Sequence, residues 1–116
     1  MKIGNKEFGF RLTVGASVQI AKLCPEGDIS RIAEAVGTNY GKQAEVLAQI
    51  VSALSNGYAA AEAFEGRKAN RLSVEDVLSV DPKTFEELTK AAFSVFGTDV
   101  KGEIEVSGSK KSVEEG

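Results

Sequence analysis

The first stretch of the chain alternates between apolar and polar positions. Apolar side chains occupy every second position of the segment KEFGFRLTVG: Phe8, Phe10, Leu12 and Val14. This period of two predicts a β-strand with one apolar face. The preceding Gly4-Asn5 pair suits a tight turn, so residues 1–3 are expected to pair with the strand as a hairpin. An isolated hairpin is marginally stable, and its apolar face therefore needs a helix of the same chain or a partner to cover it.

Two short helices are predicted after the hairpin, because the apolar spacing changes from two to three and four. The first runs until Pro25, with Ile20 and three further apolar residues at helical spacing: Val14, Val18 and Ala21. The second is capped by Asp28 and ends at Gly37. Its apolar face consists of Ile29, Ile32, Ala33 and Val36. The following segment, GTNYG, is expected to be a loop.

The longest helical pattern follows this loop and is expected to end at Gly66. Its apolar stripe contains Leu47, Ile50, Val51, Leu54, Tyr58, Ala61 and Phe64. Polar residues lie on the opposite side: Glu45, Gln49 and Ser52. An internal glycine costs about 1 kcal/mol relative to alanine, so Gly57 weakens the pattern. The stripe nevertheless keeps its phase across Gly57, which predicts one continuous helix, and we expect this helix to cover the hairpin.

Two more helices are predicted towards the carboxyl end. Ser73 is expected to cap the helix in VEDVLSV, with Leu72 and Val77 placed to pack against each other beside the cap. Thr84 and Glu87 have the spacing of a capping box at the start of the last helix. Its apolar face contains Phe85, Leu88, Ala92, Val95 and Phe96, and Gly97 is expected to end it.

These patterns predict a mainly α fold with a small amino-terminal β-hairpin (α+β), in which about five helices pack around one long central helix. The chain has 116 residues, of which 42% are hydrophobic and 27% charged, enough for one globular core. We expect residues 1–98 to form one compact domain. Residues 99–116 contain four glycines and no aromatic residue, and they are expected to be a flexible tail or, through EIEV, a weak edge strand.

Composition narrows the possible partners. The net charge of −3 argues against a protein built mainly to bind nucleic acid, which needs clustered Lys and Arg. No apolar run approaches the roughly 20 residues of a membrane span, and the first residues lack the apolar centre of a signal peptide. The single cysteine, Cys24, cannot form an internal disulfide and fits a small buried residue at a helix end. We therefore expect a cytoplasmic protein without a membrane partner.

No constellation typical of catalysis is visible. The chain contains no histidine, which removes the commonest general base, the usual catalytic triad and most zinc sites. The glycines form no phosphate-binding motif. Adjacent carboxylates such as Glu75-Asp76 diverge by about 100° on a helix and do not share a site. We expect no catalytic residue, no cofactor-binding residue and no metal ligand, and hence a protein that is not an enzyme.

Two features are candidates for binding. Arg67, Lys68 and Arg71 form the densest basic cluster of the folded region; they could hold an acidic partner or simply be a solvated loop whose charge the nearby carboxylates cancel. Small residues separate Tyr58 from Phe64, which suits either close packing inside the domain or a contact with another molecule. The face that carries these five residues is the predicted partner-binding site.

Three segments together resemble the tail assembly chaperones of long-tailed (siphovirus-type) bacteriophages, especially those of Gram-positive hosts. They are the hairpin MKIGNKEFGFRL, the alanine-rich AEVLAQIVSALSNGYAAAEAF and the run LSVEDVLSVDPKTFEELTKAAFSVF, and the resemblance covers residues 1–97. It implies a protein of the host cytoplasm, absent from the mature virion, that coats the tape measure protein while tail tube protein polymerises. It also implies a homo-oligomer, and Lys110-Lys111 as a place for programmed frameshifting.

Two other classes of protein fit the same helical composition. A structural head-tail or tail component of a virion would be found in purified particles. A small nucleic-acid-binding regulator has only the basic cluster in its support, and it would show a salt-dependent shift on DNA.

Overall fold

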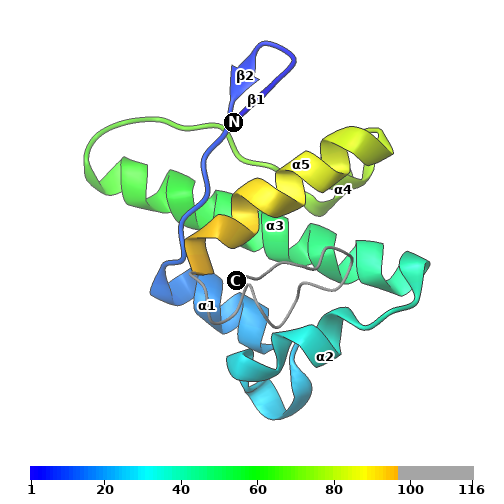
Figure 1. Ribbon diagram of the computed structural model, residues 1–116. Coiled ribbons are helices and arrows are strands. Elements are labelled where there is room, and N and C mark those ends of the chain that lie inside the picture. The colour runs from blue at the N-terminus through cyan, green and yellow to red at the C-terminus, as the bar shows by residue number, and fades with distance from the viewer. Residues whose placement is uncertain (97–116) are drawn as a thin grey trace, which may run out of the picture.

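The computed structural model describes residues 1–96 and begins with the predicted hairpin. β1 (Lys2–Ile3) pairs antiparallel with β2 (Lys6–Glu7), and Gly4 takes a φ of +63° in the turn between them (Figure 1). The strand ends at Glu7, so the alternating residues after it continue in an extended path without a strand partner among the described residues. The predicted edge strand EIEV and the predicted helix end at Gly97 lie outside the described residues.

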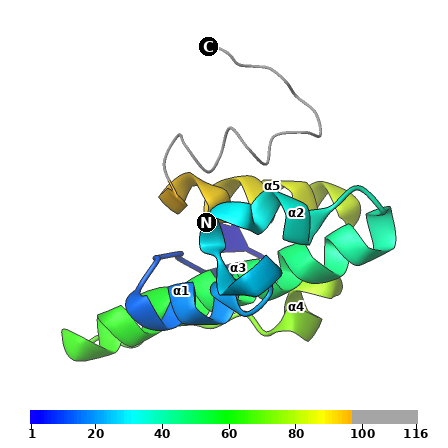
Figure 2. The same ribbon diagram turned by 90° about the horizontal axis from the view of Figure 1, so that it is seen from below.

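Five helices make up most of the remaining chain, in agreement with the predicted fold class. They are α1 (Val14–Ala21), α2 (Ile32–Val36), α3 (Tyr40–Phe64), α4 (Val74–Leu78) and α5 (Pro82–Phe93). Short 3₁₀ turns occupy Pro25–Gly27, Ile29–Arg31 and Ser94–Phe96. Helices α1, α2, α4 and α5 all contact α3, which crosses the domain as its central element (Figures 1 and 2).

The central helix is continuous through Gly57, as its apolar stripe predicted. It begins one turn earlier than expected, because the Asn39 side chain accepts a hydrogen bond from the Lys42 amide and caps the helix. Tyr40 and Gly41 therefore belong to α3, and the predicted loop GTNYG shortens to residues 37–39. The core lies around the middle of α3, where several large side chains are completely buried: Ile50, Val51 and Leu54.

The extended segment after β2 lies on α3, as expected for the hairpin. The Arg11 amide donates a hydrogen bond of 3.0 Å to the Leu54 carbonyl oxygen. A Cβ atom at Gly57 would lie only 2.5 Å from the Arg11 carbonyl oxygen, so this position requires glycine for close approach of the two backbones. Phe8 is buried, Phe10 is half-buried and Leu12 is exposed, so the cover is complete at one end of the segment only.

The predicted apolar face of α1 is wrong. Val14 and Val18 are 80% and 49% exposed, whereas Ala16 and Ile20 are buried. The segment before α1 fixes its rotation, because Thr13 caps the helix and lies against Gly57. Of the residues expected on the inner face, Ile20 alone is fully buried.

The cap predicted at Ser73 is present and is a full capping box. The Ser73 side chain accepts from the Asp76 amide at 3.0 Å, and the Ser73 amide donates to the Asp76 carboxylate at 3.0 Å. Leu72 and Val77 are both buried beside it, as the staple predicted. The capping box expected at Thr84 and Glu87 is wrong.

Asp81 caps α5 instead. Its carboxylate accepts a hydrogen bond of 2.9 Å from the Thr84 amide. Pro82 occupies the first helical position, where its missing N–H removes no helical hydrogen bond. The helix therefore begins before Thr84, and Thr84 lies inside its first turn.

Candidate partner-binding surface

The carboxyl-terminal end of α3 extends beyond α1 and away from the core (Figure 2). We name residues 60–66 the α3 tip. Ala60, Ala63 and Phe64 are exposed within it, and Phe64 is 93% exposed. An aromatic side chain that gains nothing from the core of its own domain is a candidate for contact with another molecule.

The α3 tip ends in a Schellman motif that also orients the first basic residue after it. Gly66 takes a φ of +78°, its amide donates to the Ala63 carbonyl, and the Arg67 amide donates to the Glu62 carbonyl at 2.9 Å. The Arg67 guanidinium then folds back on the Glu62 carboxylate, with N–O distances of 2.6 and 3.2 Å. This contact lowers the pKa of Glu62 and raises the pKa of Arg67.

The other predicted residues divide between the core and the surface. The Tyr58 ring is half-buried against Gly9, where an added Cβ atom would lie 2.7 Å from the ring, so Tyr58 packs inside the domain. Arg71 donates to the Asn56 side-chain oxygen at 3.2 Å, and Lys68 is exposed. The structure therefore brings Lys68 and Arg67 next to the α3 tip, whereas Tyr58 and Arg71 lie further back along α3.

Two buried serines hold the loop after α3 in place, and the sequence patterns did not predict this role. Ser52 donates to the Leu72 carbonyl at 2.8 Å, and the Leu72 amide donates to the Ser55 hydroxyl at 2.9 Å. Ser52 was expected on the exposed side of α3, yet it is buried because residues 70–73 cover that side. The only sequence signal was a pair of serines three residues apart inside an apolar run.

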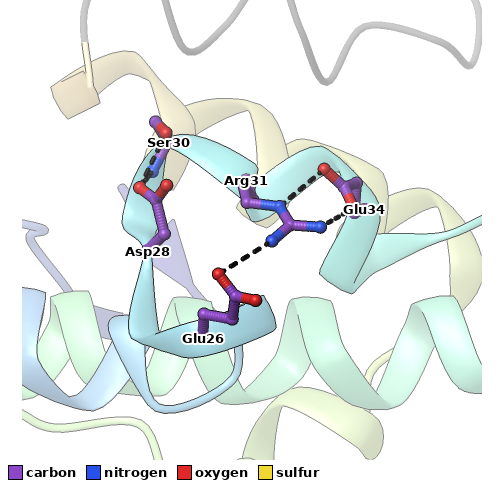
Figure 3. Close-up of polar contacts among 5 residues, drawn as sticks. All are labelled: Glu26, Asp28, Ser30, Arg31 and Glu34. Atoms are coloured by element: carbon purple, nitrogen blue, oxygen red, sulfur yellow. Dashed lines mark hydrogen bonds and ion pairs between the residues drawn. The ribbon is translucent and has the colours of Figure 1, made fainter.

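A second polar cluster lies at the turn before α2 (Figure 3). Arg31 pairs with Glu34 at 2.8 Å and with Glu26 at 3.6 Å. Asp28 accepts from both the amide and the hydroxyl of Ser30, as a cap of the short 3₁₀ turn, and these hydrogen bonds lower the pKa of Asp28. Every carboxylate drawn has a partner inside the cluster, so the cluster is explained by the turn that it stabilises.

The described residues offer little other chemistry. Within residues 1–96, no three potential ligands among His, Cys, Asp and Glu gather as they would around a metal ion. Cys24 is buried as expected, donates to the Ile20 carbonyl at 3.4 Å, and has its pKa raised mainly by burial. None of the helices in the described part of the chain is long and apolar enough to cross a bilayer.

Comparison with known proteins adds no further constraint. No protein-family model, no curated protein and no solved structure matches this chain.

Proposed function

We propose that this chain is a tail assembly chaperone of a long-tailed bacteriophage. In this role it binds the tape measure protein, keeps it soluble while tail tube protein assembles, and performs no catalysis. The proposal is supported by the resemblance of three segments in residues 1–97 and by one structural observation, the exposed Phe64 on the α3 tip. A protein with this role acts in the bacterial cytoplasm and is absent from the finished particle.

Shielding requires an exposed apolar group that can bind the apolar stripe of a client helix. Phe64 supplies such a group at the end of a helix whose middle is fixed in the core. Arg67 and Lys68 follow it directly and can pair with carboxylates that flank the apolar stripe of the client. Each contact is small and weak, so many copies bound along one long client provide the retention.

Co-expression with the tape measure protein of a long-tailed phage of a Gram-positive host tests this proposal. The wild-type chain is expected to raise the soluble fraction of that client. Phe64→Ser and the triple reversal of Arg67, Lys68 and Arg71 to Glu are each expected to reduce it. Tyr40→Ser is the matched control, because Tyr40 is another exposed aromatic residue, 69% exposed, at the opposite end of α3.

Three outcomes would count against the proposal. A client that stays equally insoluble with and without the wild-type chain would contradict the chaperone role. Equal solubility with wild type and the triple reversal would remove the basic residues from the site. Recovery of the chain in purified phage particles would favour a structural component, and a shift of DNA mobility that disappears steeply with salt would favour a regulator.

A further inference from the structure

Two exposed apolar side chains lie at opposite ends of the molecule. Phe64 is on the α3 tip, and Leu78, 48% exposed, is the last residue of α4. In both views of the ribbon, α4 lies towards the end of the domain opposite the α3 tip (Figures 1 and 2). A single molecule can therefore use both surfaces at once.

The two surfaces differ in charge. The α3 tip carries Glu62 and Glu65, and four cations lie at or near it: Arg11, Arg67, Lys68 and Arg71. Arg11 is close enough to Glu62 to contribute to its lowered pKa. The tip and its surroundings therefore have an excess of positive charge.

The surface around Leu78 has the opposite sign. Glu75 lies one turn before Leu78 on the same face of α4, and Asp76 and Asp81 are exposed close to it in the chain. Residues 72–82 contain these three carboxylates and no Lys or Arg. One cation, Lys6, lies near Asp76 and helps to lower its pKa, so the excess of negative charge centres on Glu75 and Asp81.

We propose that the α3 tip of one copy binds the Leu78 surface of a second copy of this chain. Phe64 then packs on Leu78, and the cations after the tip face Glu75 and the neighbouring carboxylates. Because the two surfaces are different, the contact is heterologous, and each added copy leaves one free surface of each kind. The assembly therefore grows head to tail. This inference rests on surfaces of the molecule and not on the client role, so each can fail alone.

Sedimentation of the purified full chain, without any client, tests the inference. Both surfaces are small, so we expect weak association with a dissociation constant of about 10 µM to 1 mM. Wild type is expected to form a concentration-dependent series of species larger than a dimer. Phe64→Asp alone and Leu78→Ser alone are each expected to reduce association at least about tenfold, because each removes one side of the contact.

Mixing the two variants distinguishes a head-to-tail contact from a symmetric one. The Leu78→Ser chain keeps an intact α3 tip, and the Phe64→Asp chain keeps an intact Leu78 surface, so the mixture is expected to form one-to-one dimers and nothing larger. Two monomeric variants that stay monomeric when mixed would overturn the heterologous contact. A wild-type chain that remains monomeric up to about 1 mM would overturn the inference as a whole.

Val18→Ser is the matched control for Leu78→Ser. Val18 is 49% exposed, on α1 and outside both surfaces, so its loss is expected to leave association unchanged. Equal effects of the two serine variants would contradict the assigned surface. Far-ultraviolet circular dichroism of all variants is expected to match wild type, because the three substituted side chains are exposed.

Discussion

Helix α3 places two apolar stretches of the same helix in opposite environments. In its middle, eleven of the fourteen residues 46–59 are buried, because neighbouring helices and residues 70–73 surround it. In the α3 tip, Ala60, Ala63 and Phe64 are exposed. Both stretches are rich in apolar residues, so local sequence does not decide their fate. What decides it is how far the neighbouring elements extend along the helix.

This difference separates stability from availability for binding. The middle of α3 holds the fold together through burial, so changes there are expected to lower the free energy of unfolding. The tip contributes little to that free energy, so its side chains can change without unfolding the domain. A surface for a client or a second copy is best placed where the fold does not depend on it.

The largest expected contrast is between truncation of a side chain in the middle and in the tip. Ile50→Ala removes a completely buried side chain and is expected to lower the free energy of unfolding by about 2–5 kcal/mol. Phe64→Ala is expected to change it by less than about 0.5 kcal/mol. Urea denaturation of both variants measures the difference. A loss at Phe64 as large as that at Ile50 would show that the tip belongs to the core.

The next largest effect is expected where the extended segment touches α3. Gly57→Ala places a Cβ atom 2.5 Å from the Arg11 carbonyl oxygen, and backbone cannot rotate away as a side chain would. We expect a loss of about 1–3 kcal/mol, despite the higher helix propensity of alanine.

Gly15→Ala is the matched control for Gly57→Ala. Gly15 is also helical, but an added Cβ atom would meet only Thr13 Oγ1, at 3.9 Å. This change is expected to raise the free energy of unfolding by about 0.5–1 kcal/mol. Thermal unfolding of the two variants should therefore shift in opposite directions, and a shift in the same direction would contradict the close approach at Gly57.

Much of the fold could be predicted because local signals determine it. The turn at Gly4, the cap at Ser73 and the continuity of α3 each follow from residues within a few positions of one another. The face of α1 could not be predicted in this way. Val14 and Ile20 are similarly apolar, and the contact of the preceding segment with Gly57 selects which one is buried.

The candidate surface could be predicted only in part, for the same reason. Phe64 and Tyr58 were assigned together because both interrupt a run of small residues. Whether an aromatic ring on α3 is covered depends on the extended segment, which reaches Tyr58 through Gly9 and leaves Phe64 uncovered. Sequence spacing places both rings on one helix, but it does not show where the covering chain stops.

A smaller effect is expected from the hydrogen bonds on the covered side of α3. Ser55→Ala leaves the buried Leu72 amide without its acceptor and is expected to lower the free energy of unfolding by about 1–2 kcal/mol. Ser17→Ala, in which an exposed hydroxyl is removed from α1, is the control and is expected to have no measurable effect. Equal stability of the two variants in urea would show that the loop is not held by this hydrogen bond.

The smallest effect on stability is expected at the α3 tip, where the Arg67–Glu62 pair is exposed to solvent. The pKa of Glu62 lies below its ordinary value of 4.5 in the folded chain. The pair therefore stabilises the fold above that value, and this contribution is lost as the pH falls through the lower pKa of the folded state. Arg67→Gln is expected to leave the thermal midpoint at pH 7 unchanged and to raise the pKa of Glu62 towards 4.5 in an NMR titration. The matched variant Lys68→Gln should leave that pKa in place, because Arg67 and not Lys68 bonds Glu62. An unchanged titration of Glu62 in the Arg67 variant would mean that the pair does not form in solution and that both charges are available to a partner.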